Sequence, residues 1–423
     1  MRNIIQGVKG ARDFYPETMR IRNFLLEHIR AVSELFGYEE YDGPFLEKIE
    51  LYAAKSGEEL VKEQSFVFPD RGGDLITLRP ELTPSLARMV AERQNELTYP
   101  LRWWSFGPFW RYEKPQKGRT REFFQWNIDL IGVNSVYADA EMLCICAEFL
   151  NSLGIEPEQV KIFVNDRKLM ETEFIEIGID QDQKKKVMKL VDRIDKLPND
   201  VWDSLILDLG ISQSQLGKLK CVLTEKKLWQ KSNELSQIFD ILKIMKVDRY
   251  VEFNPRIIRG LDYYTGIVFE AWDVGGDGRA VLGGGHYDNL VSDVGGDPLP
   301  GVGFAMGDVM ISILLEKYGK ILKGNQSGVQ VLITLFDEST GIFSYELLAE
   351  LHKVGIKSVV FPQPAKLQKQ FKFADKLGIP LVIIAGPSEI ETGNVALKNL
   401  KDGSQRDVPI DQIIEVLRSM IAL

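Results

Sequence analysis

Residues 107–132 have the sequence GPFWRYEKPQKGRTREFFQWNIDLIG, in which two strand-like runs flank a basic loop. The aromatic run WWSFGPFW ends just before the loop, and FFQWNIDLI follows it. Both are rich in the aromatic and branched residues that favour strands, so the stretch predicts a hairpin. The loop is too long for a tight turn, and loops of this length usually carry function. Five cations lie on it: Arg111, Lys114, Lys117, Arg119 and Arg121.

The chemistry of this loop suits a phosphorylated ligand. A guanidinium group is a planar fork that bonds two phosphate oxygens at once. Phe123 and Phe124 follow the loop directly and could stack on a base beside those phosphates. The alternative is a solvated basic hairpin, which is the usual explanation for a run of charges. The interleaved aromatic residues favour the ligand.

Two strings resemble one known family. The pattern F-W-R-Y-E, loop, G-R-x-R-E-F-x-Q resembles motif 2 of the class II aminoacyl-tRNA synthetases, and the insert E-K-P-Q-K-G-R resembles its histidyl-tRNA synthetase form. Residues 259–264, RGLDYY, resemble the histidine-specific signature of that family. Without the resemblance, the second string is a turn whose tyrosine hydroxyls bond locally before a strand.

The resemblance implies roles for residues at the ATP end of a site. Arg111 would bind the α-phosphate, and Phe123 would stack on adenine. Glu113 and Arg119 would line the ATP and acceptor-end site. Arg259 would lie at the α-phosphate and the amino-acid carboxylate, where a fixed cation stabilises the charge that develops during attack.

The resemblance also implies a histidine-binding set: Glu81, Thr83, Gln125, Asp129, Tyr263 and Tyr264. Glu81, Thr83 and Gln125 would surround the α-amino group. Asp129 and Tyr264 would contact the imidazole, because a carboxylate paired with a hydroxyl can recognise both ring nitrogens. An alternative for Thr83 is that it caps the helix that follows.

Other segments agree with the family, with departures. Residues 16–36 predict a long amphipathic helix, and with Pro44 they resemble motif 1, which implies a homodimer. The glycine-rich run 281–307 resembles G-G-R-Y-D followed by motif 3, or is a set of turns. His286 replaces the arginine of the first pattern, and Met310 replaces the motif 3 arginine that grips the γ-phosphate. Smaller departures are Thr120 and Phe124.

The predicted fold class is α+β, with a class II synthetase core, a helical insertion and a C-terminal α/β anticodon-binding domain. The core sheet is expected to be mainly antiparallel, and the C-terminal sheet mixed. Residues 1–164 and 249–323 would form the core, 165–248 the insertion and 328–423 the anticodon-binding domain. Short apolar runs alternate with helices in the last segment, which is typical of βαβ units.

Composition narrows the function further. The chain has 423 residues, 27% of them charged, and a formal net charge of −9, which argues against a general nucleic-acid coat. We find no secretory signal core and no membrane-spanning run. Three cysteines and three scattered histidines suggest reduced thiols in a cytoplasmic protein, with no zinc site.

These features together predict ATP-dependent activation of L-histidine to histidyl-adenylate and its transfer to the 3′ end of tRNA(His). The expected substrates are L-histidine, ATP with Mg²⁺ and tRNA(His), with no zinc, organic cofactor or membrane partner. A competing hypothesis is the histidine-sensing regulatory subunit of ATP phosphoribosyltransferase, a catalytically dead paralogue, which the Met310 departure fits. A third is a synthetase-like protein that acts only as an RNA-binding or interaction module.

Overall fold

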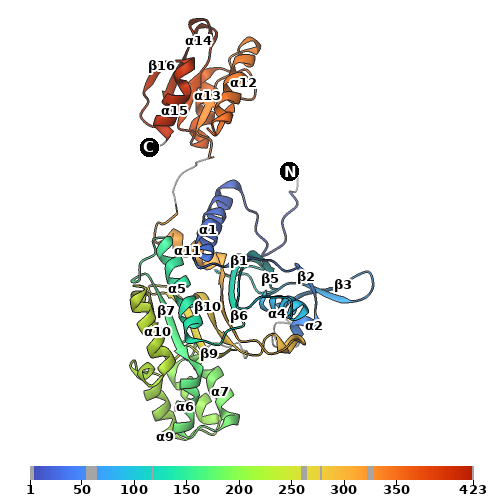
Figure 1. Ribbon diagram of the computed structural model, residues 1–423, viewed down its shortest axis with the longest axis vertical. Coiled ribbons are helices and arrows are strands. Elements are labelled where there is room, and N and C mark those ends of the chain that lie inside the picture. The colour runs from blue at the N-terminus through green and yellow to red at the C-terminus, as the bar shows by residue number, and fades with distance from the viewer. Residues whose placement is uncertain are drawn as a thin grey trace. The chain divides into compact units, whose positions relative to one another are not determined.

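The computed structural model describes residues 4–53, 64–116, 118–258, 264–276, 279–321 and 328–421. It contains two compact units, Met1–Ile321 and Leu322–Leu423, each with a hydrophobic core of its own (Figure 1).

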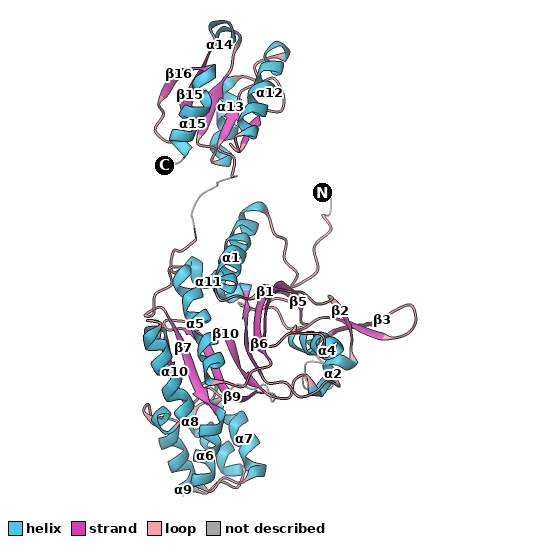
Figure 2. Ribbon diagram, viewed as in Figure 1, coloured by secondary structure: helices cyan, strands magenta, loops and turns pink. Residues whose placement is uncertain are grey.

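An eight-stranded sheet forms the centre of the first unit (Figure 2). Its order across the sheet is β1 (Glu39–Glu40), β5 (Leu101–Trp110), β6 (Glu122–Ile131), β11 (Gly301–Gly307), β10 (Ala280–Tyr287), β9 (Tyr264–Asp273), β7 (Val160–Asp166) and β8 (Val251–Phe253). Only the two outermost pairs, β1–β5 and β7–β8, are parallel. The predicted hairpin is β5–β6, and the core sheet is mainly antiparallel, as expected from the sequence.

Helices cover the two faces of this sheet differently. Trp126, Ile128 and Leu130 alternate along β6 toward the face that packs against α5 (Val136–Ser152), which α1 (Pro16–Leu35) covers in turn. On the opposite face α4 (Thr83–Arg93) packs through Leu86 and Val90. A strand sends successive side chains to opposite faces, so the odd-numbered residues of β6 lie on the α4 side.

A small sheet adjoins this core. Its order is β2 (Leu46–Lys48), β4 (Leu75–Leu78) and β3 (Phe66–Pro69), with α2 (Glu50–Ala53) after β2. β3 and β4 form a hairpin that turns at Gly72 and Gly73, and Gly73 has a φ of +94° in its turn. The chain runs from β4 through Arg79 into α4.

The segment between β7 and β8 is helical, as predicted. It contains α6 (Arg167–Ile177), α7 (Gln181–Val191), α8 (Asn199–Asp208), α9 (Gln213–Val222) and α10 (Asn233–Ile244) (Figure 1). Asp166, Asp180, Ser212 and Ser232 cap four of these helices with side-chain hydrogen bonds. Their buried residues join the core of the sheet in one cluster, and α10 packs on α5.

The second unit has a five-stranded mixed sheet. β13 (Ser358–Val360), β12 (Val331–Ile333) and β14 (Leu381–Ile384) are parallel, while β15 (Asn394–Asn399) and β16 (Gln405–Pro409) continue antiparallel. Its helices are α12 (Glu338–Lys353), α13 (Leu367–Leu377), α14 (Pro387–Thr392) and α15 (Ile413–Ile421).

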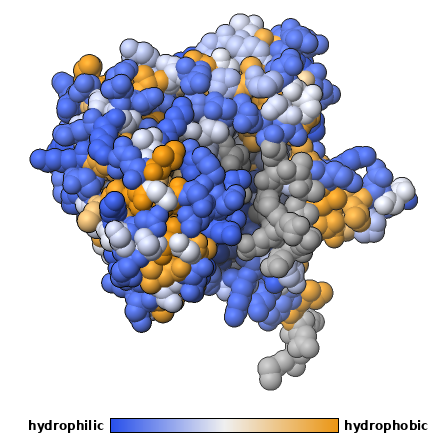
Figure 3. All heavy atoms as spheres, turned by 90° about the horizontal axis from the view of Figure 1, so that it is seen from below, coloured by the Kyte–Doolittle hydropathy of each residue, from blue (hydrophilic) through white to orange (hydrophobic). Residues whose placement is uncertain are grey.

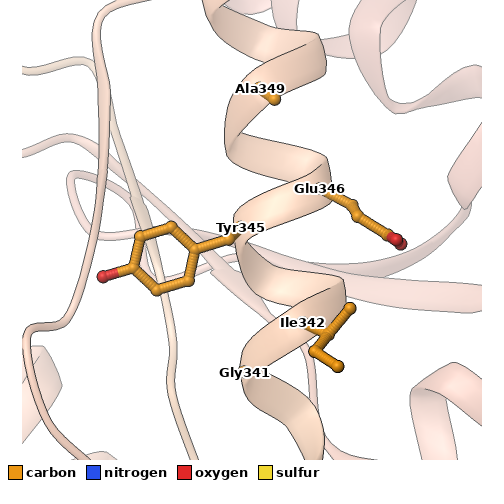
Figure 4. A pocket seen from close by; sticks show the side chains of 5 residues that line it. All are labelled: Gly341, Ile342, Tyr345, Glu346 and Ala349. Carbon is orange, nitrogen blue, oxygen red and sulfur yellow. The ribbon is translucent and has the colours of Figure 1, made fainter.

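The surface is largely polar on the face that Figure 3 shows, with hydrophobic side chains in small groups. No described helix combines the length and the hydrophobicity needed to cross a membrane. A shallow pocket lies on α12, lined by Gly341, Ile342, Tyr345, Glu346 and Ala349 (Figure 4). Ile342 and Tyr345 are exposed there and point to different sides of the helix. None of the residues singled out by the sequence lines this pocket.

Candidate active site

One face of β6 carries a row of residues that the sequence singled out. Phe123, Gln125, Asn127 and Asp129 alternate along it on the α4 side of the sheet. At about 3.4 Å per residue the row is roughly 20 Å long. The last three side chains are buried, although all are polar. Burying polar groups in the middle of a sheet costs free energy unless they gain hydrogen-bond partners, so this row is the candidate site.

Asp129 forms one end of the row. Its carboxylate accepts a hydrogen bond from the Tyr287 hydroxyl at 2.9 Å. Burial raises the pKa of Asp129 to about 7, and the hydrogen bond from Tyr287 opposes that rise. The carboxylate leans over Gly303 on the neighbouring strand, where any side chain would collide with it. Asp129 is therefore a buried carboxyl that titrates near neutrality.

Two paired glycines, Gly303 and Gly285, lie beneath Asp129 and Tyr264. Gly303 lies opposite Asp129 on one side and opposite Gly285 on the other. A Cβ atom on Gly285 would come within 2.8 Å of the Tyr264 ring. The aspartate and the tyrosine thus overhang adjacent glycines on the same face of the sheet. The pair that the sequence assigned to the imidazole is brought together here.

Two further residues of this pocket were missed by the sequence reasoning. Tyr287 lies opposite Tyr264 on β10 and supplies the hydroxyl to Asp129. Asn127 accepts a hydrogen bond from Gln125 Nε2 at 3.2 Å, and its own Nδ2 is buried with no partner among the described residues. The tyrosine of the G-G-H-Y-D segment and the period-two alternation of β6 were the available signals.

Glu81 and Thr83 lie at the start of α4, the helix that covers the site face. The Tyr52 hydroxyl donates to the Glu81 carbonyl oxygen at 3.3 Å and so holds the turn before the helix. The alternative that Thr83 caps α4 is wrong: the N-cap residue is Leu82, and no side chain caps the helix. Thr83 lies in the first turn of α4, so its hydroxyl does not cap the helix.

Arg111 and Phe123 form the other end of the row. The Arg111 guanidinium carbon lies 5.4 Å from the centre of the Phe123 ring, and its Nε donates to the Pro80 carbonyl oxygen at 2.9 Å. Phe123 stacks on Phe109 of β5 at a centroid distance of 5.9 Å. The Arg111 guanidinium and the Phe123 ring are therefore adjacent, and the chain before α4 anchors the arginine.

The loop between β5 and β6 is held by its own ion pair. Arg119 Nη1 lies 3.0 Å from Glu113 Oε2, and the Arg119 side chain is 56% exposed. Arg121 donates from Nε to the Glu113 carbonyl oxygen at 3.2 Å and covers the ring of Tyr112. Glu113 and Arg119, which the family resemblance assigns to the ATP and acceptor-end site, are thus in contact with each other. Arg259 and Tyr263 lie outside the described residues.

Two of the departures lie away from the pocket. His286 points to the opposite face of the sheet, where Nδ1 lies 2.9 Å from Asp139 of α5. Phe124 also faces that side, and its backbone N–H donates to Asp308 at 2.9 Å. Arg12 binds the same carboxylate with one nitrogen, at 2.9 and 3.1 Å to its two oxygens. These contacts fix β6 to the N-terminal arm and to α11 (Asp308–Lys317).

Two protein-family models match this chain. The family model described as histidyl-tRNA synthetase matches residues 10–308, and the model described as anticodon binding domain matches residues 330–420. A histidine–tRNA ligase of Leptospira biflexa is 35% identical over 430 residues, covering 99% of this chain and 98% of the relative. The chain belongs to the histidyl-tRNA synthetase family. The family membership and the kind of enzyme predicted from the sequence are thereby confirmed.

Two further comparisons agree. The chloroplastic/mitochondrial histidine–tRNA ligase of Arabidopsis thaliana is 36% identical over 415 residues, covering 96% of this chain and 85% of the relative. The crystal structure of a histidyl-tRNA synthetase from Nostoc sp. PCC 7120 superposes with a TM-score of 0.87 at 24% identity, over 99% of this chain and all of that one. The predicted fold class is therefore confirmed.

Among the residues that the structure describes, no three His, Cys, Asp or Glu side chains come together as metal ligands. All three cysteines are free, with Cys144 and Cys146 buried in α5 and Cys221 exposed.

Proposed function

We propose that this synthetase activates L-histidine with ATP and transfers it to the 3′ end of tRNA(His) in translation. The observation that carries the proposal is the row on β6. A carboxylate–tyrosine pocket lies at one end of it, and an arginine stacked near an aromatic ring lies at the other. A ligand that joins an imidazole to an adenine nucleotide has complementary groups at both ends of this row.

Histidine would bind with its ring between Asp129 and Tyr264. Asp129 accepts an imidazole N–H when it is ionised, and Tyr287 supports that state by donating to the same carboxylate. Glu81, Thr83 and Gln125 hold the α-amino group from the start of α4 and from β6. A pocket with such fixed polar groups rejects an apolar analogue, because its buried donors and acceptors would be left unpaired.

ATP enters as its magnesium complex, a substrate of the reaction. The histidine carboxylate attacks the α-phosphorus, a carboxyl oxygen–phosphorus bond forms, and pyrophosphate leaves as the opposite bond breaks. Arg111 and Arg259 stabilise the charge on the α-phosphate, and Phe123 stacks on the adenine. A terminal ribose hydroxyl of the tRNA then attacks the histidyl carbonyl carbon, and AMP leaves.

The regulatory-subunit hypothesis is less well supported. The adjacent Arg111 and Phe123 suit a nucleotide, which supports the synthetase over the regulatory subunit. The C-terminal unit also matches an anticodon-binding domain. The Met310 departure is the one feature in favour of a protein without catalysis.

We also propose that the protein is a cytoplasmic homodimer. Leu35 at the end of α1 is 75% exposed, and Tyr137 at the start of α5 is 69% exposed. The Tyr38 hydroxyl donates to Glu141 at 2.7 Å, which brings these two helix ends together beside the edge strand β1. Exposed apolar side chains near an open sheet edge are suited to association. Light scattering at micromolar concentration should give twice the chain mass; a fully active monomer contradicts the proposal.

Transfer of labelled histidine to tRNA tests the function directly. Purified protein with ATP and Mg²⁺ should charge tRNA(His) with histidine and should leave it uncharged with other amino acids. A second arm adds the protein to an ATP phosphoribosyltransferase catalytic subunit. Histidine-dependent control of that subunit without any charging would favour the regulatory hypothesis instead.

A further inference from the structure

The beginning of β10 brings Arg279 to the phosphate end of the site. β10 runs antiparallel to β11, with Leu282 opposite Met306. Moving backward along the chain from Leu282 therefore follows the same direction in space as moving forward from Met306. Arg279 consequently comes level with the first turn of α11, where Met310 stands.

The loop between β5 and β6 meets Arg279 and Met310 at a single point. Gly118 has a φ of +78°, a conformation that glycine adopts without strain. A Cβ atom placed on it would lie 2.7 Å from Met310 Sδ and 2.9 Å from Arg279 Nη1. The guanidinium of Arg279 and the thioether of Met310 thus both lie close to Gly118, the residue that precedes Arg119.

Position 310 lacks the positive charge that the family resemblance implies there. Met310 is uncharged, although the family resemblance implies a cation there for the outermost phosphate. Arg119 is paired with Glu113, and a hydrogen bond to the Pro80 carbonyl oxygen holds Arg111 near Phe123, where the proposed function has it bind the α-phosphate. Arg279 lies against the loop at Gly118, the same residue that Met310 approaches.

We propose that Arg279 binds the terminal phosphates of ATP and supplies from β10 the positive charge that position 310 lacks. The proposal rests on the proposed function, because it concerns the same nucleotide site. A guanidinium in this place bonds two phosphate oxygens, and it holds the pyrophosphate that leaves during activation. Arg279 is on this account a substrate-binding residue of the first reaction step.

The test compares the parent protein with Arg279→Ala, Met310→Arg and the double variant. In histidine-dependent exchange of pyrophosphate into ATP, Arg279→Ala should raise the KM for ATP and for pyrophosphate by about ten- to a hundredfold. The KM for histidine should stay within about twofold of the parent value, since the histidine pocket lies at the other end of β6. Met310→Arg in the Arg279→Ala background should restore most of the loss, because it returns a cation to the same point.

Two controls separate a binding role from a structural one. Arg249→Ala removes an exposed, ion-paired arginine two residues before β8 and should change none of these constants. Binding of AMP, which lacks the terminal phosphates, should be the same for Arg279→Ala and the parent, whereas binding of ATP should weaken.

The outcomes distinguish the inference from the function on which it rests. An active parent whose Arg279→Ala variant keeps its KM for ATP overturns the inference alone. Equal losses for ATP, AMP and histidine, with no rescue by Met310→Arg, overturn it also, because they indicate a structural role. A parent without histidine-dependent exchange that still binds ATP more weakly after Arg279→Ala would refute the proposed function and leave the phosphate site standing.

Discussion

The Tyr287 hydroxyl donates to the buried carboxylate of Asp129 across 2.9 Å, although 158 residues separate the two in sequence. The bond opposes the rise that burial imposes on the pKa of Asp129. Asp129 therefore titrates close to the pKa of free imidazole, which is about 6.5. A carboxylate whose pKa is close to that of imidazole is well suited to accept a hydrogen bond from an N–H of the histidine ring.

Replacing Tyr287 by phenylalanine should weaken histidine binding in a pH-dependent manner. Without the donor, the pKa of Asp129 rises further, and a larger fraction of the carboxyl is neutral at pH 7. We expect the KM for histidine at pH 7 to rise about tenfold, and the difference from the parent to shrink toward pH 9. Steady-state exchange kinetics at several pH values measure this. A KM that matches the parent at every pH would remove Tyr287 from the pocket.

Asp129→Asn should stabilise the protein while abolishing histidine binding. The folded-state pKa of about 7 lies above the unfolded value, so ionisation costs the folded state stability. The parent should therefore lose free energy of unfolding as the pH rises from about 4 to 7, and the variant should not. At pH 8 the variant should be more stable by about 2–4 kcal/mol, and at pH 4 the difference should vanish. Urea unfolding at both pH values tests the sign; a variant less stable at pH 8 contradicts it.

Arg259→Ala should slow adenylate formation far more than it weakens histidine binding. A fixed donor at the reacting phosphate is typically worth roughly a hundred- to a thousandfold in rate. Arg259→Lys should not restore the rate, because a lysine offers a point charge in place of a fork. Single-turnover adenylate formation is the measurement. A change below about threefold in a folded variant would mean that the catalytic cation lies elsewhere.

Removing residues 328–423 should separate the two steps of the reaction. This segment belongs to a compact unit with its own hydrophobic core, and four lysines are exposed along α13 or at its start: Lys366, Lys369, Lys372 and Lys376. Such a stripe attracts phosphates whatever the net charge of the chain. Pyrophosphate exchange should survive the deletion and aminoacylation should not. Equal loss of both activities would place the tail in the activating site.

The sequence predicted the local parts of this site and missed those that depend on strand register. The β5–β6 hairpin, with Arg111 and Phe123 at one end and Asp129 at the other, follows from residue type and the period-two alternation of a strand. Tyr287 was missed because no local signal relates it to Asp129. Only the pairing of β10 with β11, and of β11 with β6, brings them together.

Two other details also depend on the three-dimensional structure and not on residue type alone. Thr83 looked like a helix cap because its residue type favours that position, but the helix starts at this residue with Leu82 before it. His286 and Tyr287 are neighbours on β10, and only Tyr287 faces the site. Adjacent residues on a strand face opposite sides, so one reaches Asp139 and the other Asp129.

Exchange of labelled pyrophosphate into ATP, with each of the twenty amino acids in turn, tests the central claim most directly. The account predicts exchange with histidine, none above background with the others, and its loss in Asp129→Asn. Folded parent protein that shows no histidine-dependent exchange, or that exchanges equally with a different amino acid, would contradict the claim.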